Sequence, residues 1–188
     1  MAVKPILFNT DMVKAILDGR KICTRRVIKH NTEKVLDSPY HMEHSEMEDA
    51  WLIRRLCRAP YEPGDILYVR ETFIQAAAHT FWYKADDKAW MSKDLLWKPS
   101  IHMPKEAARI WLKVTDVRVE RLQEMWASDV PKEGICFTKP TTADGMLQAF
   151  ADLWNSTIKK SDIDRYGWDA NPWVWVISFE RCEKPEVV

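Results

Sequence analysis

Residues 109–122 read RIWLKVTDVRVERL, and this stretch carries the strongest strand signal in the chain. In its first half, from Ile110 to Val114, every second residue is aliphatic, as in a β-strand that buries one face. The alternation resumes in the opposite phase at Val117. A slip of one position at Thr115–Asp116 predicts a β-bulge, which allows a strand to bend around a small barrel.

Further strands and helices are predicted on both sides of this stretch. Shorter apolar runs predict strands at Val3–Phe8, Lys21–Ile28, Trp51–Cys57, Ile66–Val69, Phe81–Lys84 and Trp173–Glu180. Helical spacing predicts helices at Met12–Leu17, Gln123–Val130 and Thr142–Ser156. The helices do not alternate with the strands, which argues against a doubly wound α/β fold. We therefore expect an α+β protein, a small and mostly antiparallel β-barrel with flanking helices.

The composition is that of one globular domain spanning residues 1–188. Hydrophobic residues make up 46% of the chain and charged residues 30%, which is enough apolar surface for a core. Lys and Arg number 28, as do Asp and Glu, so the formal net charge is zero. A general cationic coat that grips nucleic acid is therefore not expected.

The sequence also indicates compartment and excludes several classes of site. No apolar run approaches the roughly 20 residues of a membrane helix, and the N-terminal residues do not resemble a signal peptide. The four cysteines form no CxxC pair, which suggests reduced thiols and a cytoplasmic protein without a membrane partner. Phosphate-loop motifs are absent, and His41 and His44 lie in a polar loop, so we expect neither cofactor nor metal.

Ten tryptophans are the unusual count. Either a small core is packed with large rings, or some of the rings line a pocket. Strand and helix periodicity assigns Trp154, Trp173 and Trp175 to packing. The tryptophans in irregular stretches, such as Trp82 and Trp168, are placed where a pocket wall or lid would be built.

The segment Gly19–Arg26, GRKICTRR, combines four cations with a hydroxyl. Strand alternation places Thr24 and Arg26 on one face and Arg25 on the other. A lysine at position 21 crowded by arginines would lose its proton more easily and could serve as a base. The alternative is a basic surface strand paired with the acidic run at 43–49, and the residues alone do not decide between the two.

Two acidic positions draw attention less strongly. Arg70 and Glu71 follow a predicted strand, where an ion pair on the surface contributes little. Glu133 precedes a glycine at a predicted helix end and, taken alone, would be considered exposed.

Taken together, these segments resemble the ASCH domain family, whose fold is a β-barrel related to the PUA domain. The resemblance is carried by Gly19–Lys21, Thr24–Arg26, Pro63–Leu67, Thr115–Leu122, Asp129–Gly134 and Trp173–Glu180. Further pieces are similar to longer, tryptophan-rich ASCH proteins of bacteriophages and prophages: Arg70–Thr72, Lys98–Pro104 and Asn171–Val176. Against the shorter members, the chain carries insertions at about 30–50 and 74–104.

The resemblance implies two functions. ASCH and PUA-like barrels are associated with RNA and modified nucleobases, so a basic cleft that binds a nucleotide, a modified nucleobase or RNA is the first expectation. The residues expected at the ligand are Arg20, Arg25, Arg26, Arg70 and Glu71. Phosphates are expected near Arg25 and Arg26, with a base stacked on an aromatic ring.

The second function is catalytic. One small bacterial member is an amidohydrolase of N4-acetylcytidine, and its lysine, threonine and glutamate match Lys21, Thr24 and Glu133. In this hypothesis Lys21 is the base, Thr24 the nucleophile and Glu133 the proton shuttle, with Arg26 near the oxyanion. Because Lys21 and Thr24 are three apart, they share a face only if a turn or bulge lies between them. A third alternative is a phage accessory protein whose pocket is vestigial.

Overall fold

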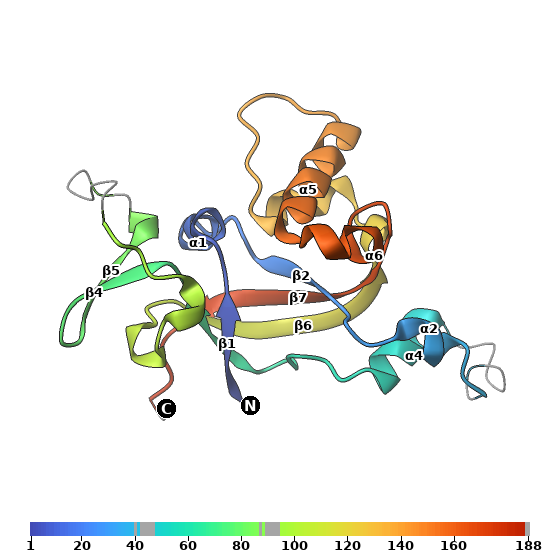
Figure 1. Ribbon diagram of the computed structural model, residues 1–188, viewed down its shortest axis with the longest axis horizontal. Coiled ribbons are helices and arrows are strands. Elements are labelled where there is room, and N and C mark those ends of the chain that lie inside the picture. The colour runs from blue at the N-terminus through green and yellow to red at the C-terminus, as the bar shows by residue number, and fades with distance from the viewer. Residues whose placement is uncertain (40, 42–47, 87, 89–94, 187–188) are drawn as a thin grey trace.

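A computed structural model describes residues 1–188 except 40, 42–47, 87, 89–94 and 187–188 (Figure 1). Its strands are β1 (Val3–Leu7), β2 (Cys23–Val27), β3 (Ile66–Arg70), β4 (Phe73–Ala77), β5 (Thr80–Tyr83), β6 (Trp111–Arg121) and β7 (Trp173–Cys182). Its helices include α1 (Thr10–Leu17), α2 (Thr32–Leu36), α4 (Asp49–Leu56), α5 (Ala143–Thr157) and α6 (Ile163–Tyr166). Short 3-10 turns connect several of them. The predicted α+β class is confirmed.

Five strands form the main sheet in the order β1-β3-β6-β7-β2. β1 runs parallel to β3, and the other three pairings in this sheet are antiparallel. A separate hairpin of β4 and β5 projects from one end of the molecule (Figure 1). The long strands β6 and β7 pair over almost their whole length and form the spine of the sheet.

The predicted bulge lies within β6. Its pairing with β7 shifts register between Val114 and Asp116, and Thr115 is the extra residue. The residues before the shift, such as Leu112, and after it, such as Val117, all enter the same core. The bulge therefore restores the inward direction of the apolar side chains when the alternation changes phase.

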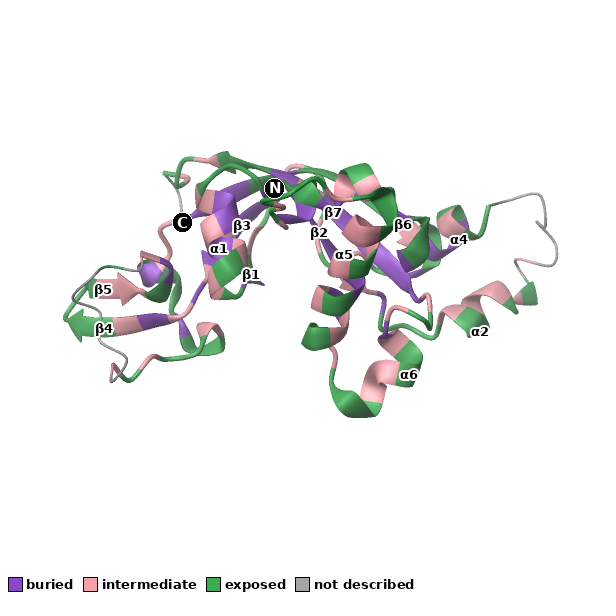
Figure 2. Ribbon diagram, turned by 90° about the horizontal axis from the view of Figure 1, so that it is seen from above, coloured by how far each residue is buried: buried purple, intermediate pink, exposed green. Residues whose placement is uncertain are grey.

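The sheet is packed on both faces at β7. Trp173, Trp175, Ile177 and Phe179 belong to the main core, which also holds β1, α1 and β3 residues. Val174 and Val176 point the other way and pack against α5 through Phe150 and Trp154. β7 is purple along most of its length in Figure 2 because both its faces are covered. The packing assigned to Trp154, Trp173 and Trp175 is confirmed.

The two edge strands approach each other without pairing. Within the described part of the chain, no ladder joins β1 to β2. Instead the Arg26 guanidinium, on β2, donates a 2.8 Å hydrogen bond to the Leu7 carbonyl at the end of β1. It also lies 5.3 Å from the centroid of the Phe8 ring. We call this junction the β1–β2 seam. Hydrogen-bonded closure into a barrel is not seen in the described residues.

Three segments have a different secondary structure from the one that the sequence predicts. Trp51–Cys57 was expected to be a strand but forms α4, because Leu52 and Ile53 are buried and the flanking residues are exposed, a narrow helical stripe. Gln123–Val130 was expected to be a helix but forms 3-10 turns around an extended Met125. The expected loop 30–49 contains α2, and its His44 lies outside the described residues. Among the described helices, none has the length and apolarity needed to cross a bilayer.

Candidate functional site

The basic segment is positioned by the end of α1. Asn9 caps the start of the helix by accepting a hydrogen bond from the Met12 amide. After its end, Gly19 adopts a left-handed backbone conformation, with φ 74°. The amides of Arg20 and Lys21 both donate to the Ala15 carbonyl. Lys21 therefore still belongs to the helix-ending turn, and β2 begins only at Cys23. This is the turn that the catalytic hypothesis requires between Lys21 and Thr24.

Glu133 ends a 3-10 turn at Pro131–Glu133 rather than an α-helix. Gly134 follows with φ 96°, and a Cβ atom there would lie 2.8 Å from the Ala15 Cβ and 3.1 Å from the Lys21 Cβ. Only a glycine lets this turn lie so close to α1. The Ile22 amide donates to the Lys132 carbonyl, which ties the two segments together. Glu133 is consequently 4% exposed, against the expectation of an exposed residue.

Lys21, Arg25 and Glu133 form a buried ion network. Lys21 Nζ lies 2.8 Å from Glu133 Oε2 and also donates to the Glu133 carbonyl, at 2.7 Å. A guanidinium nitrogen of Arg25 lies 3.0 Å from Glu133 Oε1. Lys21 is therefore paired with a carboxylate and not merely crowded by cations. A base role for Lys21 would require its proton to pass first to Glu133.

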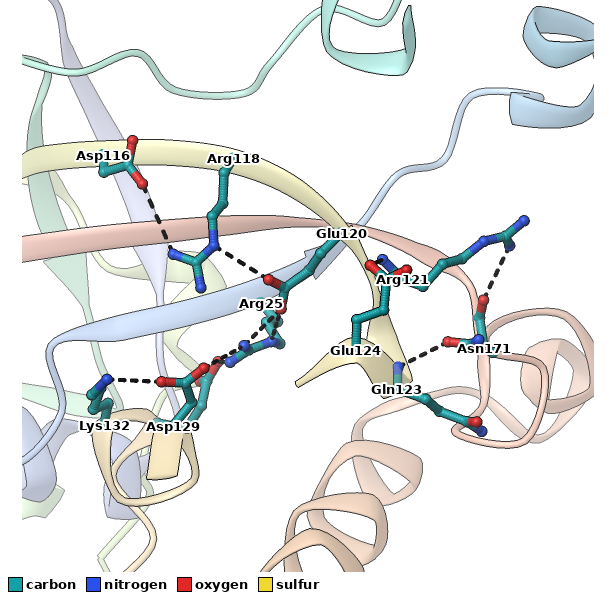
Figure 3. Close-up of polar contacts among 11 residues, drawn as sticks. Arg25, Asp116, Arg118, Glu120, Arg121, Gln123, Glu124, Asp129, Lys132 and Asn171 are labelled. Carbon is teal, nitrogen blue, oxygen red and sulfur yellow. Dashed lines mark hydrogen bonds and ion pairs between the residues drawn. The ribbon is translucent and has the colours of Figure 1, made fainter. Parts of the chain in front are cut away.

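Arg25 is held by further carboxylates on its other side. It lies 2.6 Å from Glu120 and 3.5 Å from Asp129, and its side chain is fully covered (Figure 3). Burial opposes the charged form of Arg25, yet Glu133 and Glu120 outweigh this effect and raise its pKa. Its donors are thus directed to carboxylates in this structure, and the expectation that Arg25 contacts a phosphate stays a prediction.

Cys23 is the thiol beside Thr24. Its side chain is buried, and burial, reinforced by the Glu133 charge, raises the pKa of the thiol to about 12. A thiol in this state carries almost no thiolate at neutral pH and is a poor nucleophile. The only oxygen nucleophile that this strand offers to the neighbouring pocket is the Thr24 hydroxyl.

A pocket of about 200 Å³, partly open to solvent, lies beside this network. Its walls come from the end of β1 and the start of α1 on one side, and from α5 on the other. It is lined by Leu7, Phe8, Asn9, Met12, Lys21, Thr24, Arg25, Arg26, Glu133, Phe150, Leu153, Trp154 and Thr157. The three residues of the proposed catalytic set are thus brought to one pocket, together with Arg25 and Arg26. We call it the β2 pocket.

The β2 pocket follows the free edge of β2. Three consecutive residues, Thr24 to Arg26, line it, and successive side chains of a strand point to opposite faces. A pocket that runs along the strand edge accounts for contact with all three. The Ile28 amide donates to Trp173 and the Ile22 carbonyl accepts from Phe179, so the even-numbered residues bond β7. The backbone N–H and C=O of Arg25 therefore point away from β7, toward the free edge.

Three residues expected at the ligand lie elsewhere. Arg20 donates to the Gly134 carbonyl and pairs with Asp18, so it braces the turn and does not line the β2 pocket. Arg70 donates to the Ile101 carbonyl. Glu71 is 1% exposed and forms a two-point ion pair with Arg109, at 2.9 and 3.0 Å. Burial raises the pKa of Glu71. Both belong to the joint between the main sheet and the β4–β5 hairpin.

The sequence did not identify the aromatic walls of the pocket. Phe150 and Trp154 were assigned to the apolar stripe of a packing helix, and they do pack there, but their outer edges also face the pocket. Phe8 follows a strand in which no feature marks a ligand contact. Helical spacing identifies the stripe but not which part of it remains uncovered, because that depends on how α5 packs against the rest of the fold.

Comparisons with known proteins give structural matches only. No family model matches the sequence, and no curated protein does. An ASCH domain from Lactobacillus crispatus is similar in structure, with a TM-score of 0.45 and 10% identity over 96% of this chain and 79% of that one. A protein from Enterococcus faecalis has a TM-score of 0.45 and is 12% identical, and the match covers 97% of this chain and 76% of that one. A hypothetical protein has a TM-score of 0.41 and is 13% identical, and the match covers 97% of this chain and all of the other.

Proposed function

We propose that this chain is an ASCH-type protein that binds a nucleobase, carried by a nucleotide or by RNA, in the β2 pocket. The observation that carries the proposal is the shape of that pocket. Aromatic side chains stand on its two sides, Phe8 on one and Phe150 with Trp154 on the other. Between them runs a strand edge with backbone donors and acceptors and one hydroxyl, that of Thr24.

This combination suits a flat, polar heterocycle. Base–aromatic stacking contributes about 1–3 kcal/mol per base, and hydrogen bonds at the base edge select its identity. The Lys21–Glu133–Arg25 network forms the buried end of the pocket and holds fixed charges close to the ligand. Its cations and carboxylates are mutually paired, so the pocket favours a neutral base over a phosphate at that end.

The test is binding of single nucleosides. Intrinsic fluorescence reports binding because Trp154 lines the pocket. We expect one of the four nucleoside 5′-monophosphates or N4-acetylcytidine to bind, and Thr24→Val to weaken it about fivefold, the value of one hydrogen bond. Thr115→Val, at the exposed bulge of β6, is the matched control and is expected to bind as wild type does. Absence of binding by every one of the five compounds would refute the proposal.

Hydrolysis of an N4-acyl group is the second candidate, favoured by the 2.8 Å contact of Lys21 with Glu133 beside the Thr24 hydroxyl. Lys21 would pass a proton to Glu133 and then accept that of Thr24, whose oxygen attacks the amide carbonyl. Protonated Glu133 would donate its proton to the leaving amine, and water would then hydrolyse the acyl ester on Thr24.

Turnover of N4-acetylcytidine separates the two candidates. If hydrolysis occurs, Thr24→Val removes the nucleophile and lowers the rate at least about a hundredfold. If wild type and Thr24→Val release acetate at the same rate, the catalytic candidate is rejected and binding stands alone.

The proposal also keeps two further predictions. One is that the sheet forms a PUA-like barrel, which the Arg26 side chain closes at the β1–β2 seam. The other is that the chain is related to ASCH proteins of bacteriophages and prophages.

A further inference from the structure

A separate hollow of about 380 Å³, open to solvent, lies at the β1–β2 seam. β1 contributes Ile6 and Leu7 to its walls, and β2 contributes Arg26 and Val27. Trp175 of β7, which pairs with Arg26 across the sheet, also lines it. The hollow therefore lies where the two edge strands come together without a backbone ladder in the described residues. We call it the seam hollow.

The rim of the seam hollow is cationic. Three exposed side chains line it: Lys29 and His30, just after β2, and Arg58, just after α4. Among the described residues, none of the three has a carboxylate within ion-pair distance, and no acidic residue lines the hollow. The rim thus concentrates positive charge in a chain whose net charge is zero.

Arg26 adds a further cation, and it is partly buried. Its neighbour Arg25 meets three carboxylates, whereas the described contacts of the Arg26 guanidinium are the Leu7 carbonyl and the Phe8 ring. Burial opposes the charged form of both arginines. In Arg25 the carboxylates outweigh it and raise the pKa, but in Arg26 burial prevails and lowers the pKa. An anion beside Arg26 would supply the counter-charge that the protein does not.

The inner end of the seam hollow is apolar and aromatic. Trp175 is 3% exposed and Ile6 is 1% exposed, and both side chains also belong to the main core. Tyr61 is half-buried, and its hydroxyl donates a 2.8 Å hydrogen bond to the Pro5 carbonyl, which fixes the ring as one wall. A ligand that suits both ends would therefore combine an apolar body with an anionic head group.

We propose that the seam hollow is a second binding site, which takes a small phosphomonoester with an apolar body. A phosphate group carries nearly two negative charges at neutral pH and three acceptor oxygens, and arginine binds it with two parallel hydrogen bonds. The oxygens would lie among Arg26, Lys29 and Arg58. The body of the ligand would lie against Tyr61 and Trp175.

This site does not rest on the base-binding proposal. The seam hollow and the β2 pocket have two lining residues in common, Leu7 and Arg26, and these form the bridge across the β1–β2 seam. A guanidinium has five N–H groups, so a phosphate can bind Arg26 while the bond to Leu7 stays. The ligand would then hold the guanidinium in place and tie the two edge strands together. It would act as an effector that stabilises the seam.

The probe is phenyl phosphate at pH 8, where it is a dianion. Inorganic phosphate lacks the body and benzyl alcohol lacks the charge, so we expect each to bind at least about tenfold more weakly in calorimetry. In two-dimensional NMR the indole N–H signal of Trp175 should shift, and that of Trp154, which does not line the seam hollow, should not. Equal affinity for inorganic phosphate, an adventitious ion only, would overturn the proposal. A shift of Trp154 without one of Trp175 would also overturn it.

The variant Lys29→Ala/Arg58→Ala removes two rim cations, neither of which lines the β2 pocket. We expect phenyl phosphate to bind about tenfold or more weakly, with unchanged thermal stability. The control Arg55→Ala/Lys139→Ala removes the same charge from exposed positions that line neither hollow. If the two double variants weaken binding equally, the cations of the rim are not the site.

The effector role has its own readout. Saturating phenyl phosphate should slow amide hydrogen exchange at Leu7 and Phe8 about threefold or more in wild type and leave Arg26→Met unchanged. Unchanged exchange in wild type would overturn the effector role. The two proposals fail separately. A chain that binds phenyl phosphate but no nucleoside keeps the seam site and loses the base pocket, and the opposite result leaves only the base pocket.

Discussion

Glu133 is the residue on which the buried network depends. One of its carboxylate oxygens pairs with Lys21 and the other with Arg25, and all three side chains are almost completely covered. Replacing a buried ion network with apolar residues can be nearly neutral, but removing one member leaves the others charged in a medium of low dielectric constant. The network therefore constrains sequence change here more than its net contribution to stability would suggest.

Glu133→Ala is expected to lower the free energy of unfolding by about 3–5 kcal/mol, because it leaves two buried cations short of a counter-charge. Urea denaturation followed by fluorescence measures the change. The control is Glu106→Ala, an exposed residue paired with the exposed His79, for which a change within about 0.5 kcal/mol is expected. The double variant Lys21→Met/Glu133→Leu should recover part of the loss. Equal stability of Glu133→Ala and wild type would contradict the assignment.

Elements were predictable where a periodic pattern ran for many residues. The bulged strand and the last strand appear as expected, as β6 and β7, because their alternation runs for ten residues or more. The helices α1 and α5 also appear as expected, because their apolar spacing spans two helical turns or more. Short apolar runs were ambiguous. Residues 51–57 fit a strand and a helix equally, and packing against α2 and β6 decides for α4. The strand β4 was missed because its outer residues are exposed.

Gly134 shows how one turn sets the spacing between two elements. Gly134→Ala combines a left-handed backbone, at φ 96°, with a Cβ clash against α1. Gly64→Ala has a similar φ, 90°, and nothing within 4 Å of the new Cβ. We expect about 1 kcal/mol of destabilisation for Gly64→Ala from backbone strain alone and at least about 2 kcal/mol more for Gly134→Ala. Thermal denaturation of the pair measures the difference, and equal losses would show that the contact with α1 is not tight.

At the scale of the molecule, the β2 pocket is assembled from segments that are distant in sequence. Residues from segments 7–12, 21–26 and 150–157 meet there with Glu133. The basic motif and Glu133 could be selected from the sequence because they match a family pattern. The walls from α5 could not, and neither could the placement of Arg20, Arg70 and Glu71 away from the β2 pocket. Which side chains meet depends on how the sheet curls, and no local pattern encodes that.

The β1–β2 seam gives a prediction at this scale. Arg26→Met keeps the apolar stem and removes the bridge to the Leu7 carbonyl. We expect faster amide hydrogen exchange, by about tenfold, at the end of β1 and at Phe8, since local openings become less costly. α5 should exchange as before. Arg55→Met, on exposed α4 surface, is the control. Unchanged exchange at Phe8 would mean that β1 is held by β3 alone.

The position of β2 in the sheet has a consequence for how the protein is made. Cys23 of β2 pairs with Ser178 of β7, 155 positions later in the chain. During synthesis the strand that carries Thr24 and Arg25 leaves the ribosome early and has no partner until almost everything else has followed. Contacts of such long sequence separation slow folding. The pocket therefore forms in one of the last steps of folding, and a nascent or shortened chain that lacks β7 would be unable to hold a ligand there.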